Sequence, residues 1–179
     1  MVGGSGAGKG TQAKQLSQHL QIPVIAVGEI LRAGIANQSY LGLQAKPYVE
    51  RGELVPDEII IQFMRQRLMR PDVSQGWILD GYPRTAFQAE ELDFLLTELQ
   101  QSLDWAIYLK LTESVMLKRS LNRALADDKL EIVQRRLARF QERTVPILEY
   151  YDGTHRLLTI NGEAVIETVT QEILAKLSC

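Results

Sequence analysis

The residues best placed to do chemistry lie near the start of the chain, where positions 3–11 read G-G-S-G-A-G-K-G-T. Glycine has no Cβ atom, so the four glycines among the first eight residues let successive N–H groups turn toward a single anion. Lys9 adds a point charge for terminal phosphates, and the helix expected from that residue points its positive end at the same place. The pattern predicts a phosphate-binding loop.

The spacing of this loop follows G-x-x-x-x-G-K, a common phosphate-binding pattern, with one departure. The pattern calls for Ser or Thr directly after the lysine, whereas here Gly10 follows and Thr11 comes one residue late. The alternative interpretation is a glycine-rich turn that binds nothing. The position of the lysine at a helix start favours the phosphate site.

Asp80 is a second candidate, because it directly follows the apolar run Trp77-Ile78-Leu79. Ligands of parallel α/β sheets bind outside the carboxyl ends of the strands, so a carboxylate there can serve Mg²⁺ or its waters. A carboxylate that only caps a turn is the alternative. A phosphate loop in the same sheet favours the functional interpretation.

The elements that must position these residues alternate between short apolar strands and amphipathic helices, which predicts a parallel sheet with helices on both faces. Strands are expected over 23–27, 76–80, 105–109 and 157–160, and helices over 9–20, 28–36, 40–50, 56–68, 85–101, 112–125, 129–151 and 164–177. Only Met1 and Val2 precede the loop, whereas a strand has about five or six residues. We therefore expect a truncated first strand and a natural start several residues upstream.

The composition is that of a soluble globular chain of 179 residues, 45% hydrophobic and 23% charged, which predicts a single domain. The net charge of −2 argues against a nucleic-acid partner. The single cysteine, Cys179, excludes an internal disulfide framework, and no apolar run approaches membrane-spanning length. His19 and His155 are isolated, so no metal-ligand cluster is expected. A cytoplasmic protein without a membrane partner is predicted.

Four stretches in order along the chain resemble the adenylate kinase family: residues 3–12, GEILR at 28–32, LVPDE at 54–58, and DGYPRT at 80–85 with Gln88. The shifted Gly10-Thr11 is what this family carries, and the resemblance extends to Asp127-Asp128 and to residues 160–162. It implies an α/β P-loop three-layer fold with a parallel five-stranded sheet. It also implies a nucleoside monophosphate kinase of the short-lid type, which transfers the γ-phosphoryl group of ATP to AMP and yields two ADP.

The resemblance also implies residue roles. The residues implied to bind ATP are Gly6, Ala7, Gly8, Lys9, Gly10, Thr11, Arg119, Arg123 and Ala164. Those implied to bind AMP are Val27, Arg32, Glu53, Leu54, Val55, Gly81, Tyr82, Pro83, Arg84, Gln88 and Arg136. The catalytic set is Lys9, Asp80, Arg84, Arg123 and Arg136, with Asp80 ordering the waters of an ATP-bound Mg²⁺ rather than binding the metal directly. In this scheme Arg32 and Arg84 grip the AMP phosphate, Gln88 reads the base, and Arg119 lies against the adenine of ATP.

Arginine suits these roles because its planar fork holds phosphate in a bidentate manner and stays charged. Arg119 and Arg123, four residues apart, share one helix face. Without the phosphate loop such a pair would be interpreted as solvated.

Within one P-loop kinase domain over 1–179, the acceptor flap is expected at about 28–54 and a very short donor lid at about 123–128. A monomer is expected.

Two departures from the family affect the activity that we expect. Leu125 occupies the place of a lid arginine, which predicts reduced turnover because one cation near the transferring phosphoryl group is missing. Val27 stands where adenylate kinases carry threonine, which predicts looser base choice, with AMP first and UMP or CMP behind it. A UMP/CMP-type kinase and a degenerate nucleotide-binding protein are therefore the alternatives. A P-loop kinase for a non-nucleotide molecule is disfavoured by Arg84 with Gln88.

Overall fold

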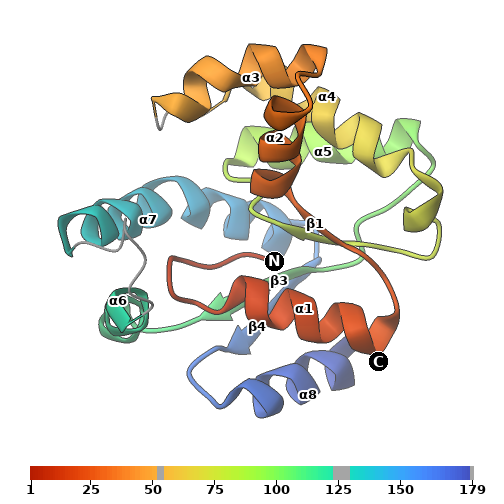
Figure 1. Cartoon of the computed structure of the whole chain (residues 1–179). Coiled ribbons are helices and arrows are strands. Elements are labelled where there is room, and N and C mark those ends of the chain that lie inside the picture. The colour runs from red at the N-terminus through yellow and green to blue at the C-terminus, as the bar shows by residue number, and fades with distance from the viewer. Residues whose placement is uncertain (52–54, 123–129, 178–179) are drawn as a thin grey trace.

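The computed structural model of the chain describes residues 1–51, 55–122 and 130–177, apart from the side chains at 131, 132, 135, 136, 139, 143 and 144 within the last segment. Figure 1 shows helices on both sides of short parallel strands. The elements in order are α1 Lys9–Leu20, β1 Val24–Ala26, α2 Val27–Ala36, α3 Tyr40–Glu50, α4 Asp57–Leu68, η1 Pro71–Val73, β2 Ile78–Asp80, α5 Ala86–Glu98, β3 Ala106–Lys110, α6 Glu113–Asn122, α7 Leu130–Gly153, β4 Leu157–Asn161 and α8 Ile166–Leu177.

Local capping signals account for the starts of α3 and α5. The bounds predicted for α1 and α3 agree with the structure. Helices α4, α5, α6 and α8 begin one or two residues later than predicted and α5 ends three residues earlier, whereas α2 begins one residue earlier and α7 ends two residues later. The Ser39 side chain caps α3 by accepting a hydrogen bond from Gly42 N, and Thr85 caps α5 by accepting one from Gln88 N, each at 3.1 Å. A side-chain oxygen at this position satisfies an N–H group that has no partner inside the helix.

The predicted five-stranded sheet is not formed among the described residues. The strands instead make two parallel pairs, β1 with β2 and β3 with β4. Residues 1 and 2 lie between the pairs: the Met1 amino group donates to Leu79 O at 2.9 Å, and Val2 N donates to Ile107 O at 2.8 Å. Val2 makes only an isolated bridge to Tyr108. Two residues supply too few hydrogen bonds for a strand ladder, so the sheet divides at this point.

Buried side chains from both faces of the strands form the core. On one face, Ile25 of β1 and Leu92 of α5 belong to a cluster that includes Met64 of α4. On the other face, Leu109 of β3 and Leu16 of α1 lie in a second cluster. Helices thus cover both faces, as predicted. No helix among the described residues is both long and apolar enough to cross a bilayer.

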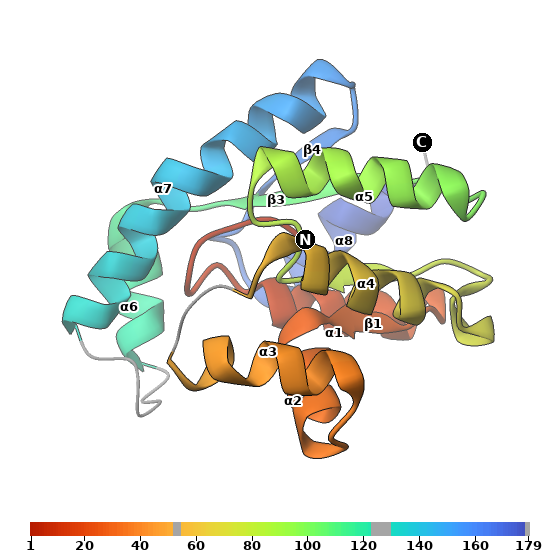
Figure 2. The ribbon, with the colours of Figure 1, turned by 90° about the horizontal axis from the view of Figure 1, so that it is seen from above.

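Helices α2 and α3 form a separate pair that projects away from α5 and α7 in Figure 2. The two helices meet closely, because a Cβ atom on Gly42 would lie 2.0 Å from the carbonyl oxygen of Gly34. On Gly34, a Cβ atom would lie 2.9 Å from the Phe63 ring of α4. The pair therefore rests on α4 through glycine-lined contacts, which is the arrangement of a small appendage attached to the core.

Candidate active site

The loop before α1 has the backbone that its glycines predicted. Gly6 and Gly8 have φ angles of 79° and 89°, in the left-handed region that favours glycine. Gly8 is the N-cap of α1 and supplies no side-chain hydrogen bond to the helix. The first N–H groups of α1 therefore face the loop without a side-chain cap, as an anion site at a helix N-terminus requires.

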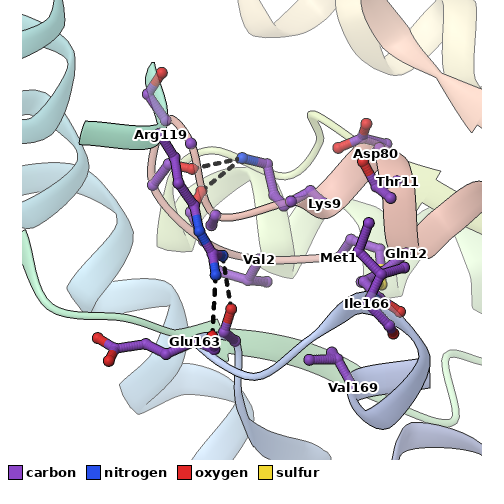
Figure 3. Close-up of a pocket in the computed structure, with 18 of the residues that line it drawn as sticks. Met1, Val2, Lys9, Thr11, Gln12, Asp80, Arg119, Glu163, Ile166 and Val169 are labelled. Atoms are coloured by element: carbon purple, nitrogen blue, oxygen red, sulfur yellow. Dashed lines mark hydrogen bonds between the residues drawn. The ribbon is translucent and has the colours of Figure 1, made fainter. Parts of the chain in front are cut away.

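Lys9 lies across this loop. Its Nζ atom donates to the carbonyl oxygens of Gly3 at 2.7 Å and Gly4 at 3.0 Å, drawn as dashed lines in Figure 3. The ammonium group thus stands at the mouth of the loop, where a phosphate would meet it. These contacts hold the start of the loop against the lysine.

Helix α6 packs directly on the loop and fixes its shape. A Cβ atom on Gly6 would lie 2.4 Å from the carbonyl oxygen of Met116, and Ser120 Oγ donates to Ser5 Oγ at 3.2 Å. A side chain at position 6 would therefore collide with backbone atoms of α6. The glycine is needed for close packing as well as for its backbone angle.

The loop opens into a cavity of about 1270 Å³ that gathers most of the predicted site residues. Those that line it are Gly6, Ala7, Gly8, Lys9, Gly10, Thr11, Asp80, Gly81, Pro83, Arg84, Arg119 and Ala164. Asp80 ends β2 and faces α1, because a Cβ atom on Gly10 would lie 3.4 Å from Asp80 Oδ2. Figure 3 shows Asp80 beside Thr11 at the start of α1.

Arg84 lines the same cavity and follows the turn after β2. Its Nε atom donates to Gly81 O at 2.8 Å, and its backbone N–H donates to Gln88 Oε1 at 2.7 Å. Desolvation lowers the pKa of Arg84 from its usual value, and the Asp80 carboxylate opposes the shift. A guanidinium stays protonated in proteins, so Arg84 supplies a fixed positive charge to the cavity.

Gln88, predicted to read the acceptor base, is buried at 7% exposure and does not line this cavity. Its Nε2 atom donates to Asp57 Oδ1 at 2.6 Å, while its Oε1 accepts from Arg84 N. The Tyr82 hydroxyl donates to Gln88 O at 3.2 Å. Both ends of the amide thus have protein partners in this state.

Arg119 shapes the other end of the cavity by holding the turn between β4 and α8. Its Nη1 and Nη2 atoms donate to Gly162 O at 2.7 Å and Glu163 O at 3.1 Å (Figure 3). The Glu163 carboxylate accepts from Thr112 N at 2.7 Å and from the Thr112 hydroxyl at 2.8 Å. Those hydrogen bonds lower the pKa of Glu163. The turn that carries Ala164 is thereby fixed to α6 through Arg119 and to the residue before α6, Thr112.

Some predicted acceptor residues lie away from this cavity. Val27 and Val55 are buried in the core at 4% and 7% exposure, whereas Arg32 is exposed on α2, near Gly28. Tyr82 is buried at 4%. Glu53, Leu54, Arg123 and Leu125 lie outside the described residues, as does the side chain of Arg136 on α7.

Two residues at the site were missed as candidates. Gln12, buried at 3%, donates through Nε2 to Ile166 O at 3.1 Å and accepts from the Thr170 hydroxyl at 2.8 Å, so it joins α1 to α8. A polar residue on the apolar face of α1 was the signal available in the sequence. For Glu163 no local pattern gives a signal, because Thr112 is 51 residues away.

A glycine loop at a helix N-terminus, a strand-end carboxylate and arginines around one large cavity define a P-loop phosphotransferase. A family model described as "Adenylate kinase" matches residues 1–156. The chain is 62% identical over 174 residues to "Adenylate kinase 2" of a Nostoc species, covering 97% of this chain and 95% of the relative. It is 58% identical over 177 residues to "Adenylate kinase 2" of a Synechocystis species, covering 99% and 98%.

The chain therefore belongs to the adenylate kinase family. This confirms the predicted enzyme class, a nucleotide-binding kinase. A third relative, "Adenylate kinase 1" of the same Nostoc species, is 43% identical over 176 residues, covering 98% of this chain and 96% of the relative.

Proposed function

We propose that the chain transfers the γ-phosphoryl group of ATP to AMP, so that each nucleotide leaves as ADP. The observation that carries the proposal is that the phosphate loop, Asp80 and Arg84 line one cavity. A donor site and an acceptor phosphate site that open to the same space allow the in-line alignment that phosphoryl transfer requires. The relatives named adenylate kinase support the same reaction.

On the donor side, the N–H groups of residues 6–11 bind the ATP phosphates at the positive end of α1. Lys9 exchanges its contacts with Gly3 and Gly4 for phosphate oxygens, and its charge spans to the transferred group. Arg119 and Ala164 form the adenine end of the site, and Arg123 contacts the phosphates. The phosphates of two nucleotides repel each other when they are aligned for transfer. The lysine and the arginines therefore offset this repulsion as well as bind the phosphates.

On the acceptor side, Arg32 and Arg84 hold the AMP phosphate and Gln88 reads the base. The remaining acceptor wall is formed by Val27, Glu53, Leu54, Val55, Gly81, Tyr82 and Pro83. Arg136, whose side chain lies outside the described residues, is assigned to the transferring group. In this scheme α2 and α3 belong to the acceptor flap of about 28–54, and a short donor lid is assigned to residues 123–128, which lie outside the described residues. Their closure excludes water, the competing acceptor.

The residues at the loop fit an Mg²⁺ ion that arrives with ATP. Mg²⁺ keeps several waters and is usually held by one or two carboxylates together with substrate phosphates. The described residues contain no group of three or more His, Cys, Asp or Glu side chains that could hold a metal by themselves. Asp80 lies beside Thr11 at the phosphate loop. Asp80 would hold the waters of the ion. When bound, the ion neutralises charge on the phosphate oxygens.

In this proposal residues 1 and 2 take the position of the first strand of a P-loop fold, between the two observed strand pairs, without completing the five-stranded sheet. The proposal also takes the protein to act as a monomer in a reducing compartment such as the cytoplasm.

The test is a coupled assay of ADP formation from ATP with AMP, UMP or CMP in turn, at fixed Mg²⁺. We expect the highest kcat/KM with AMP. A higher kcat/KM with a pyrimidine monophosphate would instead establish a UMP/CMP-type kinase. ATP binding without ADP formation from any acceptor would establish the degenerate nucleotide-binding protein.

A further inference from the structure

We propose that Asp57 is a positioning residue for base selection, which acts by fixing the orientation of the Gln88 side-chain amide. The inference rests on the proposed role of Gln88 in reading the acceptor base. Asp57 is the first residue of α4 and lies 31 positions from Gln88 along the chain. The contact joins the start of α4 to the first turn of α5.

The two partners of the amide leave it a single orientation. Asp57 Oδ1, 2.6 Å away, can only accept when ionised, so it requires the NH₂ group of Gln88. The Arg84 backbone N–H, 2.7 Å away, can only donate, so it requires the carbonyl oxygen. A flip of the amide would place donor against donor and acceptor against acceptor. Both contacts would be lost at a site that is nearly closed to water.

The rest of Gln88 is fixed independently of Asp57. Its backbone N–H donates to the Thr85 hydroxyl at 3.1 Å, and its carbonyl oxygen accepts from the Tyr82 hydroxyl at 3.2 Å. The backbone of Gln88 is therefore held in place by its own helix start and by the preceding turn. The orientation of the terminal amide is what Asp57 and Arg84 decide.

The fixed Gln88 amide still has one N–H donor and one lone pair available for a base. A glutamine amide has two N–H groups and two lone pairs, and the protein uses one of each. Adenine presents an amino donor next to a ring-nitrogen acceptor, which one orientation of the amide matches. Hypoxanthine, a purine of the same size, presents a carbonyl acceptor next to an N–H donor and needs the flipped amide. Locking the amide therefore discriminates between the two bases by their hydrogen bonds alone.

The experiment compares kcat/KM for AMP and for inosine monophosphate at saturating Mg-ATP in the full chain. Asp57→Ala is expected to lower the AMP preference about tenfold, since a charge-assisted hydrogen bond is lost, while KM for ATP stays unchanged. Asp57→Asn is expected to stay within about threefold of the wild-type preference, because its carbonyl oxygen can still accept from Nε2. Glu58→Ala is the matched control: it removes an exposed acidic residue from the same first turn of α4.

Each remaining outcome decides the question. If Gln88→Ala lowers the AMP preference but Asp57→Ala does not, the positioning role is wrong and the base-reading role stands. If Asp57→Asn and Asp57→Ala lower the AMP preference equally, the loss of preference comes from the carboxylate charge, and the hydrogen-bond argument is overturned. An unchanged AMP preference in Gln88→Ala would refute the base-reading role itself. If Asp57→Ala is unstable by circular dichroism, Asp57→Ser repeats the test with a polar group too short to reach Nε2.

Discussion

Lys9 and Gly3 are joined by a hydrogen bond of 2.7 Å from the lysine Nζ to the glycine carbonyl oxygen. The same ammonium group also contacts Gly4 O at 3.0 Å. The lysine therefore ties the first residues of the loop to the start of α1. In the proposed function, Lys9 exchanges these contacts for phosphate oxygens of ATP. The proposed function thus gives this one side chain a structural contact and a catalytic contact.

The first prediction concerns Lys9→Ala, which removes the cation at the mouth of the loop. We expect kcat/KM for ATP to fall at least about 100-fold, because charge on the transferring group loses a fixed partner. Lys14→Ala is the control, since Lys14 is exposed on the same helix and does not line the cavity. Equal rates in the two variants would contradict the role of Lys9.

A second prediction compares two glycine substitutions. Gly6→Ala places a Cβ atom 2.4 Å from Met116 O at a φ of 79°, so we expect a loss of more than about 2 kcal/mol in the free energy of unfolding. Gly153→Ala adds a Cβ atom with nothing within 4 Å, and we expect a change below about 1 kcal/mol. Urea unfolding followed by circular dichroism measures both. A Gly6→Ala protein as stable as Gly153→Ala would show that α6 does not pack on the loop.

The third prediction tests the ion pair that ties α5 to the start of β4. Arg156 donates to both Asp93 carboxylate oxygens, and Tyr150 donates to Oδ2 at 2.7 Å. The Asp93 and Arg156 side chains are 23% and 25% exposed. Asp93→Ala leaves the arginine poorly solvated, so we expect a loss of about 2 kcal/mol in unfolding free energy.

The control for Asp93 is Glu50→Ala, which breaks the exposed Lys46–Glu50 pair on α3. Exposed ion pairs of this kind contribute little to stability, so we expect Glu50→Ala to lower the free energy of unfolding by less than about 0.5 kcal/mol. Urea unfolding followed by circular dichroism measures both the Asp93→Ala and the Glu50→Ala variants. Similar losses at the two sites would mean that burial does not strengthen the Asp93 cluster.

A fourth prediction is a pH dependence at Glu163. Hydrogen bonds from Thr112 to the carboxylate lower the pKa of Glu163 below its usual value of 4.5. A carboxyl group whose pKa is lower in the folded state contributes stability above pH 4.5, and this is lost as pH falls through the folded value. We expect wild type to be more stable than Glu163→Gln at pH 7 and the difference to shrink below pH 4.5. A difference that grew in acid would contradict the Thr112 contacts.

The fifth prediction concerns Leu125, which lies outside the described residues and is expected from the family resemblance to take the place of an arginine. Leu125→Arg is expected to raise kcat about tenfold or more, because a cation near the transferring phosphoryl group is restored. Leu125→Gln, which is polar but uncharged, is the control. No gain over Leu125→Gln in steady-state kinetics would show that this position does not limit turnover.

The sequence predicted the bounds of α1 and α3 because their apolar residues recur at helical spacing and their ends carry local signals. It also placed Asp80 at a strand end beside the phosphate loop, since ligands of parallel sheets meet that edge. The five-stranded sheet failed as a prediction, because strand pairing depends on partners far along the chain. The bond between Val2 and Ile107 could not be read from either local stretch.

By itself, the sequence determined the phosphate loop, the order of strands and helices, and the family, because each of these is written in short contiguous patterns. Only the tertiary structure decided that Gln88 is tied to Asp57, that Glu163 holds Thr112, and that α6 closes on Gly6. Each of these contacts joins segments at least 31 residues apart. Local pattern fixes which side chains are available, and packing fixes which of them meet.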